Sequence, residues 1–356
     1  MLNREGDKIM NKIKSALHDF GLPRTILALF VIGLFLIVPF AGLNLGTMTT
    51  NVLNRFVMNS VFVLAMVPMV HSGCGLNFGL PLGIEAGLLG ATLSIEFGFT
   101  GPMSFIMAIV ISTPFAIVFG IGYGFLLNRI KGGEMMIATY VGFSIVALMC
   151  LAWIALPYKS PNMVWGFSGT GLRTTITVDG YYNGILSDLF KIEIGSLVIP
   201  TGGILFFIVL ALIVWAFLHT KTGTAMTAVG SNPNFARAAG INVDTIRTIS
   251  VVMSTWIGAI GILVYQQSFG FIQLYNAPFS MAMPAAAAVL LGGASVNKAS
   301  IFNVVVGAIF YQSIVTLTPT IMNALISLDI SDVIRTLISY GVILYALTRK
   351  TEGGKK

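Results

Sequence analysis

Ionisable and amide side chains inside long apolar runs are the residues of this sequence with the clearest chemical potential. Glu85 lies within LPLGIEAGLLG. A charged group in an apolar phase is costly and usually faces a helix-bundle interior or a water-filled path. Glu85 therefore either lines a translocation pathway or makes a hydrogen-bonded contact between helices, and a proton or sodium site is a third hypothesis. The amides of Asn77, Gln266 and Gln267 can bind a solute or join helices to each other.

No residue pattern is typical of an enzyme. The three histidines, His18, His71 and His219, do not have the spacing of a zinc site. The stretch GGASVNKAS, at residues 292–300, lacks the second glycine before Lys298 that a phosphate-binding GxxxxGKS/T loop requires. We therefore expect no catalytic residue, no metal and no cofactor in this chain. Any work driven by ATP has to use an ATPase in another subunit.

The polar stretch SNPNFARAAG, at residues 231–240, has the signals of a complete short helix. Asn232 can cap its N-terminus with a side-chain oxygen, Pro233 suits the first helical position, and Gly240 suits the left-handed position that ends a helix. Phe235 shares one face with the alanines three and four positions later. Two interpretations are open: this face enters a groove on a partner, or Phe235 folds back onto the chain's own helices.

The elements that must position these residues are membrane helices. Of the 356 residues, 56% are hydrophobic and 9% are charged, whereas soluble domains carry about 25% charged residues. Several apolar runs reach the roughly 20 residues that cross a bilayer. The sequence predicts an all-α polytopic integral membrane protein with about ten spans, near residues 25–43, 57–72, 77–98, 102–127, 135–157, 197–218, 248–267, 281–296, 299–318 and 333–348.

The distribution of basic residues predicts the orientation of these spans. If the N-terminus is inside, the segments on that side hold fifteen of the 20 Lys and Arg residues, in agreement with the positive-inside rule. Both termini are then cytoplasmic. We expect a cytoplasmic lead-in at residues 1–24, a transmembrane domain at 25–348 and a basic cytoplasmic tail at 349–356. The transmembrane domain contains an external segment at 158–196 and a cytoplasmic loop at 219–247. Within the external segment, YYNGILSDLF is expected to form a short amphipathic helix at the membrane interface.

The stretch CGLNFGLPLG, at residues 74–83, predicts a broken or re-entrant helix because it combines three glycines, a proline and an asparagine. Irregular backbone is tolerated at membrane depth only where protein or water covers it. Transporters often build binding sites at such breaks. The candidate residues of a solute pathway are accordingly Asn77, Glu85, Gln266 and Gln267.

Two stretches carry a resemblance to a known family. The sequence from Thr220 through GTAMTAVGSNPNFARAAGINV, ending at Val243, is similar to TxxGxxxxA(I/V)GxNxxAARxxGIN, the cytoplasmic loop of permease subunits in the ribose-type and branched-chain-amino-acid-type ABC importer family. Phe235 replaces an alanine of that pattern. AAAAVLLGGAS, at residues 285–295, resembles a second family motif, AAxVLGGxS. The resemblance covers residues 55–350, and the matching loop positions are Thr220, Gly223, Ala228, Val229, Gly230, Asn232, Ala236, Arg237, Gly240, Ile241 and Asn242.

The resemblance implies partners for this chain in a bacterial cytoplasmic membrane. These are a second permease chain, two cytoplasmic ATPase subunits that use ATP and magnesium, and an extracytoplasmic solute-binding protein that docks on the external segment. The loop helix would enter a cleft on an ATPase, and aspartate at Gly230 or Phe235 is expected to weaken that association. The residues implied in the coupling are Gly223, Ala228, Gly230, Asn232, Phe235, Ala236, Arg237 and Gly240.

The resemblance also narrows the solute. Sugar members of the family carry GGIDLSxG after the second span, but here SGCGLNFG, at residues 72–79, has Gly75 at the aspartate position. Nucleoside members read approximately GLxNIGxEGQ, which is partly similar to GLNFG followed by Glu85, and GGEMMIAT at 132–139 is similar to a later motif of theirs. Simple sugars and nucleosides are thus the implied solutes, and branched-chain amino acids come third. From the residues alone, an ion-coupled secondary transporter that uses Glu85 is the alternative, and a membrane-embedded enzyme is disfavoured.

Overall fold

The computed structural model describes residues 22–130, 132–166, 170–295 and 298–326, with four single positions at 333, 336, 337 and 341. Eleven helices and four short strands lie in this part of the chain. The helices are α2 (Leu22–Phe40), α3 (Leu45–His71), α4 (Leu80–Glu96), α5 (Gly101–Arg129), α6 (Glu134–Ala155), α7 (Thr201–Leu218), α8 (Lys221–Ser231), α9 (Pro233–Ala238), α10 (Val243–Phe269), α11 (Phe279–Leu291) and α12 (Ile301–Ile326). The strands are β1 (Thr175–Thr177), β2 (Ile192–Ile194), β3 (Leu197–Ile199) and β4 (Phe271–Gln273).

Among the described residues, six helices are long and apolar enough to cross a membrane: α3, α5, α6, α7, α10 and α12. α2 and α11 are shorter apolar helices, and α4 has 17 residues. These nine helices correspond in position to the first nine predicted spans. The tenth, near 333–348, lies outside the described residues except for four single positions, as do the predicted tail and nearly all of the lead-in. The fold is that of an all-α membrane protein.

The predicted span at 57–72 began too late, because α3 starts at Leu45. The side chain of Asn44 caps it, with its Oδ1 accepting a hydrogen bond from the backbone N–H of Thr47 at 3.1 Å. The first turns of α3 are polar, so a count of apolar residues misses them. Asn51, Asn54 and Arg55 consequently lie inside a membrane helix and not in a loop before it.

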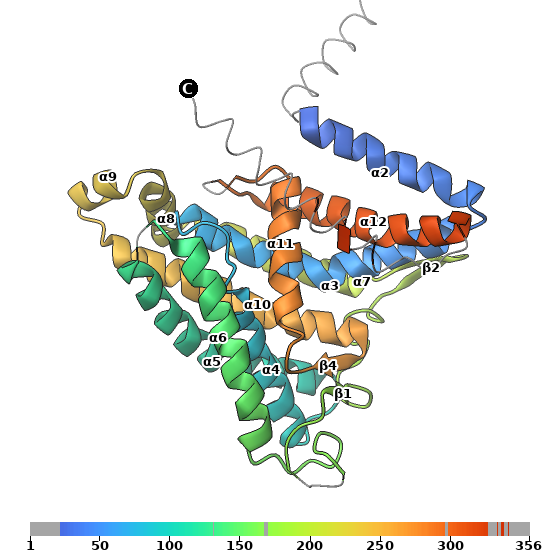
Figure 1. The fold of residues 1–356 in the computed structure, drawn as a ribbon, viewed down its shortest axis with the longest axis horizontal. Helices are drawn as coiled ribbons and strands as arrows, with labels where there is room; N and C mark the ends of the chain where they lie inside the picture. The colour runs from blue at the N-terminus through green and yellow to red at the C-terminus, as the bar shows by residue number, and fades with distance from the viewer. Residues whose placement is uncertain are drawn as a thin grey trace, which may run out of the picture.

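The helix ends lie at two opposite ends of the molecule, one that carries α8 and α9 and one that carries β1, β2 and β4 (Figure 1). Hydrogen bonds and ion pairs join neighbouring helix ends at each of them. At the end that carries α8 and α9, the contacts join Arg24 to Gly293, His71 to Ala299 and Arg247 to Glu134. At the other end they join Ser160 to Glu96, Ser196 to Asn44 and β1 to β4. Successive long helices therefore run in alternating directions.

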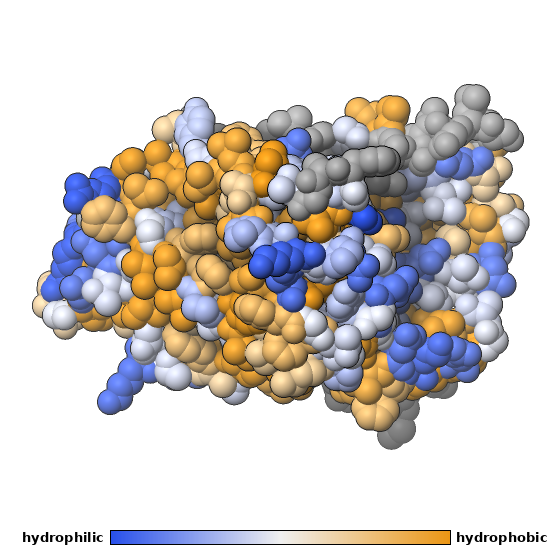
Figure 2. Space-filling model, turned by 90° about the horizontal axis from the view of Figure 1, so that it is seen from below, coloured by the Kyte–Doolittle hydropathy of each residue, from blue (hydrophilic) through white to orange (hydrophobic). Residues whose placement is uncertain are grey.

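The core lies around α3, α4 and α10. Gly83 lets α4 approach α10 closely, since a side chain there would meet the carbonyl oxygen of Thr255. By contrast α5, α6 and α7 expose many large apolar side chains, such as Val118, Leu151 and Leu212. Figure 2 shows broad apolar areas on one face of the molecule, with hydrophilic side chains at the edge where α8 and α9 lie. Such a surface is suited to lipid or to another membrane subunit.

The segment between α6 and α7 contains strands and turns. β1 pairs with β4, and β2 and β3 form a hairpin. The short helix predicted at 181–190 was wrong, because these residues form a succession of turns. Gly184 has a φ of +69° and Phe190 a φ of +53°, which a right-handed helix does not accommodate. Tyr182 is fully buried, and its hydroxyl donates to Oε1 of Gln266 at 2.7 Å. The turns therefore pack against α10.

Candidate functional site

The loop between α7 and α10 contains two helices, each with its own N-terminal cap. Thr220 accepts the backbone N–H of Gly223 at the start of α8. At the start of α9, Oδ1 of Asn232 accepts the backbone N–H groups of Asn234 and Phe235, both at 3.1 Å. Pro233 is the first residue of α9. The predicted N-terminal signals are thereby confirmed.

The end of α9 is also as predicted. Gly240 has a φ of +81°, and its N–H donates to the carbonyl of Arg237 at 3.0 Å. The N–H of Ile241 donates to the carbonyl of Ala236 at 3.0 Å. This pair of bonds is the Schellman arrangement, which satisfies carbonyls that a helix end leaves unpaired. A helix of six residues is too short to be stable alone, so the caps fix its shape.

Phe235 projects away from the protein, with 68% of its surface exposed. Its neighbour Ala236 is fully buried, against Val229 of α8 and Val243 of α10. The interpretation in which Phe235 folds back onto the chain's own helices is therefore wrong. α9 is anchored through its alanine and presents a large apolar ring outward.

The other predicted coupling residues fall into two groups. Asn232, Arg237 and Gly240 are exposed around Phe235 on α9. Gly223 and Gly230 of α8 instead pack inward, and Ala228 is half-buried. A side chain at Gly223 would meet the backbone of Leu218, and one at Gly230 would meet the carbonyl oxygen of His71. α8 thus attaches the loop to the protein, and α9 carries its exposed face.

The chain between α3 and α4, where a broken helix is predicted, is irregular from 72 to 79 and almost wholly buried. Three contacts tie this segment to α10: Ser72 to Ser250 at 2.5 Å, Cys74 Sγ to Arg247 Nε at 3.2 Å, and Asn77 Nδ2 to Ser254 Oγ at 2.7 Å. Arg247 also forms a largely buried ion pair with Glu134 at the start of α6, with Nη2 and Oε1 at 2.6 Å.

Three of the four predicted pathway residues have partners within the protein. Asn77 binds Ser254 and accepts a hydrogen bond from Tyr123 at 3.2 Å. Gln266 accepts from Tyr182, and Oε1 of Gln267 accepts the backbone N–H groups of residues 186 and 187. These bonds hold the α3–α4 segment and the 181–190 turns against α10. Asn77 contacts the middle of α10, at Ser254, whereas the two glutamines lie near its C-terminal end.

Glu85 is the fourth predicted residue, and its environment differs. It is fully buried in α4, and neither carboxylate oxygen has a hydrogen-bond partner among the described residues. Burial of an ionised carboxylate without partners is very costly. Among the described residues, no group of three or more His, Cys, Asp and Glu side chains is arranged to hold a metal ion.

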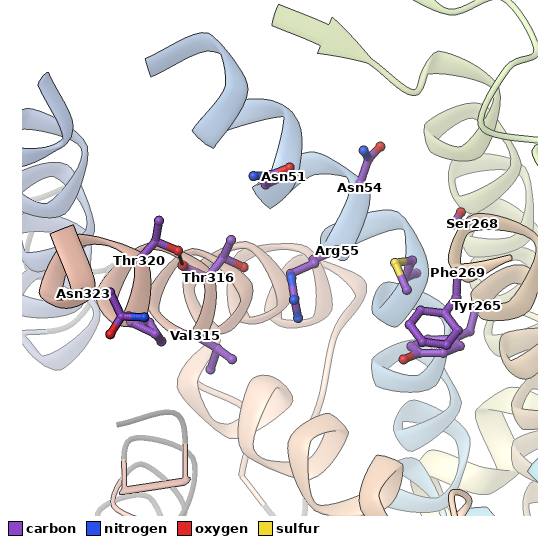
Figure 3. A pocket seen from close by; sticks show the side chains of 12 residues that line it. Asn51, Asn54, Arg55, Tyr265, Ser268, Phe269, Val315, Thr316, Thr320 and Asn323 are labelled. Atoms are coloured by element: carbon purple, nitrogen blue, oxygen red, sulfur yellow. Dashed lines mark hydrogen bonds between the residues drawn. The ribbon is translucent and has the colours of Figure 1, made fainter. Parts of the chain in front are cut away.

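A polar cavity of about 790 Å³ lies between α3, α10 and α12, within the range of small-molecule sites. Arg55 extends from α3 between Asn323 of α12 on one side and Tyr265 of α10 on the other (Figure 3). Among the described lining residues, Arg55 is the one charged side chain. The polar groups that line it are Asn51, Asn54, Arg55, Tyr265, Ser268, Thr316, Thr320 and Asn323.

A second cavity of about 220 Å³ shares Arg55 and Tyr265 with the first and adds Gln273, Ser280 and Gln312. None of the four predicted pathway residues lines either cavity. Sequence reasoning missed this site, although a signal was present. The polar residues of NVLNRFVMN recur at Asn51, Asn54, Arg55 and Asn59, which is helical spacing on one face within an otherwise apolar stretch.

Known proteins are similar to this chain over most of its length. The model of the family described as "Branched-chain amino acid transport system / permease component" matches residues 23–347. The autoinducer 2 import system permease protein LsrC of Shigella flexneri is 23% identical over 267 residues, 74% of each chain. That of Yersinia pseudotuberculosis serotype O:3 (strain YPIII) is 22% identical over 306 residues, 85% of this chain and 82% of the relative. A solved inward-facing conformation of a putative metal-chelate type ABC transporter shares the fold, with a TM-score of 0.50 at 14% identity over 91% of this chain and 98% of that one.

Proposed function

The chain belongs to the permease-component family of branched-chain amino acid transport systems, and from this premise we propose how it receives energy and what it carries. It is a multi-pass transmembrane permease of a bacterial ABC importer. It is the permease component and not itself an ATPase. ABC importers work with ATPase subunits and a solute-binding protein, so the energy of transport enters this chain through a contact with another subunit.

We propose that α9 is that contact. The exposure of Phe235 on a doubly capped helix carries the proposal, because an apolar ring of this size is suited to a groove on a partner. Asn232, Arg237 and Gly240 would form its polar rim. In this proposal the loop at 219–247 is cytoplasmic, both termini are cytoplasmic, and 158–196 faces the solute-binding protein. The basic residues of the inner segments support that orientation.

Copurification of ATPase subunits with the tagged chain tests this contact. Phe235→Asp is expected to reduce the recovered ATPase at least about tenfold, since the loss of a central aromatic anchor costs on the order of 2 kcal/mol. Phe190→Asp is the matched control, because Phe190 is 71% exposed and lies in the segment proposed to face outward. The proposal fails if both variants recover the ATPase at the level of the parent chain.

We further propose that two permease chains form the translocation pathway and that its solute is a simple sugar or a nucleoside. The amides and hydroxyls around Arg55 support a solute rich in hydrogen-bonding groups. Autoinducer 2 is a candidate of the same kind, because the relatives are named for its import. Branched-chain amino acids are the second candidate, since the family description names them.

The proposal ranks Glu85 above the other three predicted pathway residues, which are Asn77, Gln266 and Gln267. Glu85 stays a candidate for the pathway, supported by its lack of a hydrogen-bond partner among the described residues. The other three already have protein partners, which supports a structural role beside any contact with solute. An ion-coupled mechanism at Glu85 is the rival, and uptake that requires no ATPase subunit would favour it.

A further inference from the structure

His71, the last residue of α3, contacts two segments far from it in sequence. Its Nε2 lies 2.7 Å from the carbonyl oxygen of Ala299, just before α12, and its Nδ1 lies 3.3 Å from Oγ1 of Thr227 in α8. A carbonyl oxygen only accepts, so Nε2 carries a hydrogen. A neutral ring accepts at Nδ1 the one hydroxyl hydrogen of Thr227, for which the carbonyl oxygen of Gly223 at 3.3 Å competes. A charged ring instead donates to the Thr227 hydroxyl, which then donates to Gly223.

Beside this side chain, the backbones of α8 and of the α3–α4 segment meet at two glycines, Gly230 and Gly73. A methyl group built on Gly73 would lie 3.0 Å from Cα of Gly230. No flexible side chain separates the two segments at this point, so α8 displaces residues 71–73 when it moves toward them. When α8 moves away, the hydrogen bond between His71 and Thr227 is what draws these residues along. Packed interiors transmit such shifts because they have little free space.

The same segment is attached to α4 and α10. It leads into α4, which carries Glu85, and Ser72 and Asn77 bind α10. Ala299 leads into α12, which lines the Arg55 cavity. His71 is therefore the side chain at which the loop, the α3–α4 break and the α11–α12 turn meet.

We propose that His71 is a positioning residue that transmits movement of α8 and α9 to the α3–α4 break and to α12. This inference rests on the proposed function, because the movement begins with ATPase contact at α9. Thr227 is its partner on the loop. When the hydroxyl of Thr227 is absent, α9 still binds the ATPase, but the α3–α4 break no longer follows α8 when α8 moves away from it.

Cys74 is a native reporter of that break. It is 2% exposed, so its thiol reacts only when the segment moves, and it lines a cavity of about 360 Å³ through which a reagent can reach it. The experiment uses the chain with Cys150→Ala, copurified with its ATPase subunits from native membranes. The rate at which N-ethylmaleimide labels Cys74 is compared without nucleotide and after trapping with ATP and vanadate.

In this parent complex we expect the two labelling rates to differ by about fivefold or more, the change in an equilibrium that corresponds to about 1 kcal/mol. Thr227→Val should remove most of that difference, whereas Thr227→Ser, which keeps the hydroxyl, should preserve it. His71→Met keeps a side chain of similar length and lacks both the donor toward Ala299 and the acceptor toward Thr227, so it should resemble Thr227→Val. Equal recovery of ATPase in all variants separates transmission from binding.

The proposal is overturned if Thr227→Val and His71→Met keep the nucleotide-dependent difference, or if the parent complex shows none. A parent chain that recovers no ATPase contradicts the proposed function instead. A merely structural role of His71 predicts lower thermal stability of these variants together with an unchanged ratio of the two labelling rates. That outcome also overturns the proposal.

Discussion

The carbonyl oxygen of His71 occupies the place where a side chain on Gly230 would begin. α8 therefore packs with its backbone directly on the end of α3. This glycine belongs to the loop pattern that resembles the family. Its φ is not in the left-handed region, so the physical reason for a glycine here is the close approach of the two backbones. The attachment of the loop and its exposed face are built from different residues of one motif.

Gly230→Ala is expected to destabilise the protein by about 1–3 kcal/mol, because the added methyl group meets backbone atoms that have no free space around them. Thermal unfolding in detergent measures the effect. Gly122→Ala in α5 is the control, since nothing lies within 4 Å of a side chain there, and it should be neutral or stabilising. Gly230→Asp therefore tests packing within the chain, and equal stability of Gly230→Ala and the control would contradict this reasoning.

Arg247→Met is expected to cost about 3 kcal/mol, because it leaves Glu134 as a largely buried charge without its ion-pair partner. Adding Glu134→Gln should recover more than half of that loss, since the second change removes the stranded charge. The double-mutant cycle is read from thermal unfolding of the four chains. Additive losses in the double variant would show that the pair contributes little to stability.

The loop shows what a sequence makes predictable. The caps of α9 follow from local chemistry at Asn232, Pro233 and Gly240, where each residue satisfies backbone groups next to it. The orientation of Phe235 does not follow, because it depends on how Ala236 packs between α8 and α10. Periodicity assigns a residue to a face, and tertiary contacts decide which face is covered.

The Arg55 cavity was missed for a related reason. Averaged hydropathy placed Arg55 before the second span, although the spacing of the polar residues from 51 to 59 is helical. The turns at 181–190 were mistaken for a helix because their apolar residues also have helical spacing. The positive φ of Gly184 and Phe190, together with burial of Tyr182 against α10, overrides that periodicity.

Substitution of Arg55 is expected to reduce transport if the Arg55 cavity is part of the solute pathway. Arg55→Met removes five N–H donors from a site lined by amides and hydroxyls. Uptake of labelled D-ribose or adenosine into proteoliposomes should fall about tenfold, the size expected when a hydrogen bond to a charged group is lost. Lys159→Met removes an exposed charge in the segment between α6 and α7 and serves as the control. Unchanged uptake in Arg55→Met, with normal uptake in the parent, would rule the cavity out as part of the pathway.

Substitutions of Glu85 distinguish ATP-driven transport from an ion-coupled mechanism. One of them, Glu85→Leu, is expected to raise stability and lower uptake. Glu85→Leu replaces a buried carboxyl group that has no described hydrogen-bond partner, so it should stabilise the protein by on the order of 1 kcal/mol. If the carboxyl group serves the solute pathway, the same variant should lose uptake, because a polar group is kept at a cost to stability only where function needs it. Glu85→Gln, which stays polar at nearly the same volume, should retain most ATP-driven uptake.

An ion-coupled mechanism instead predicts that Glu85→Gln loses uptake and that uptake by the parent chain depends on an ion gradient. An ionophore added at constant ATP detects that dependence. Greater stability with unchanged uptake in Glu85→Leu would instead assign the residue to neither mechanism.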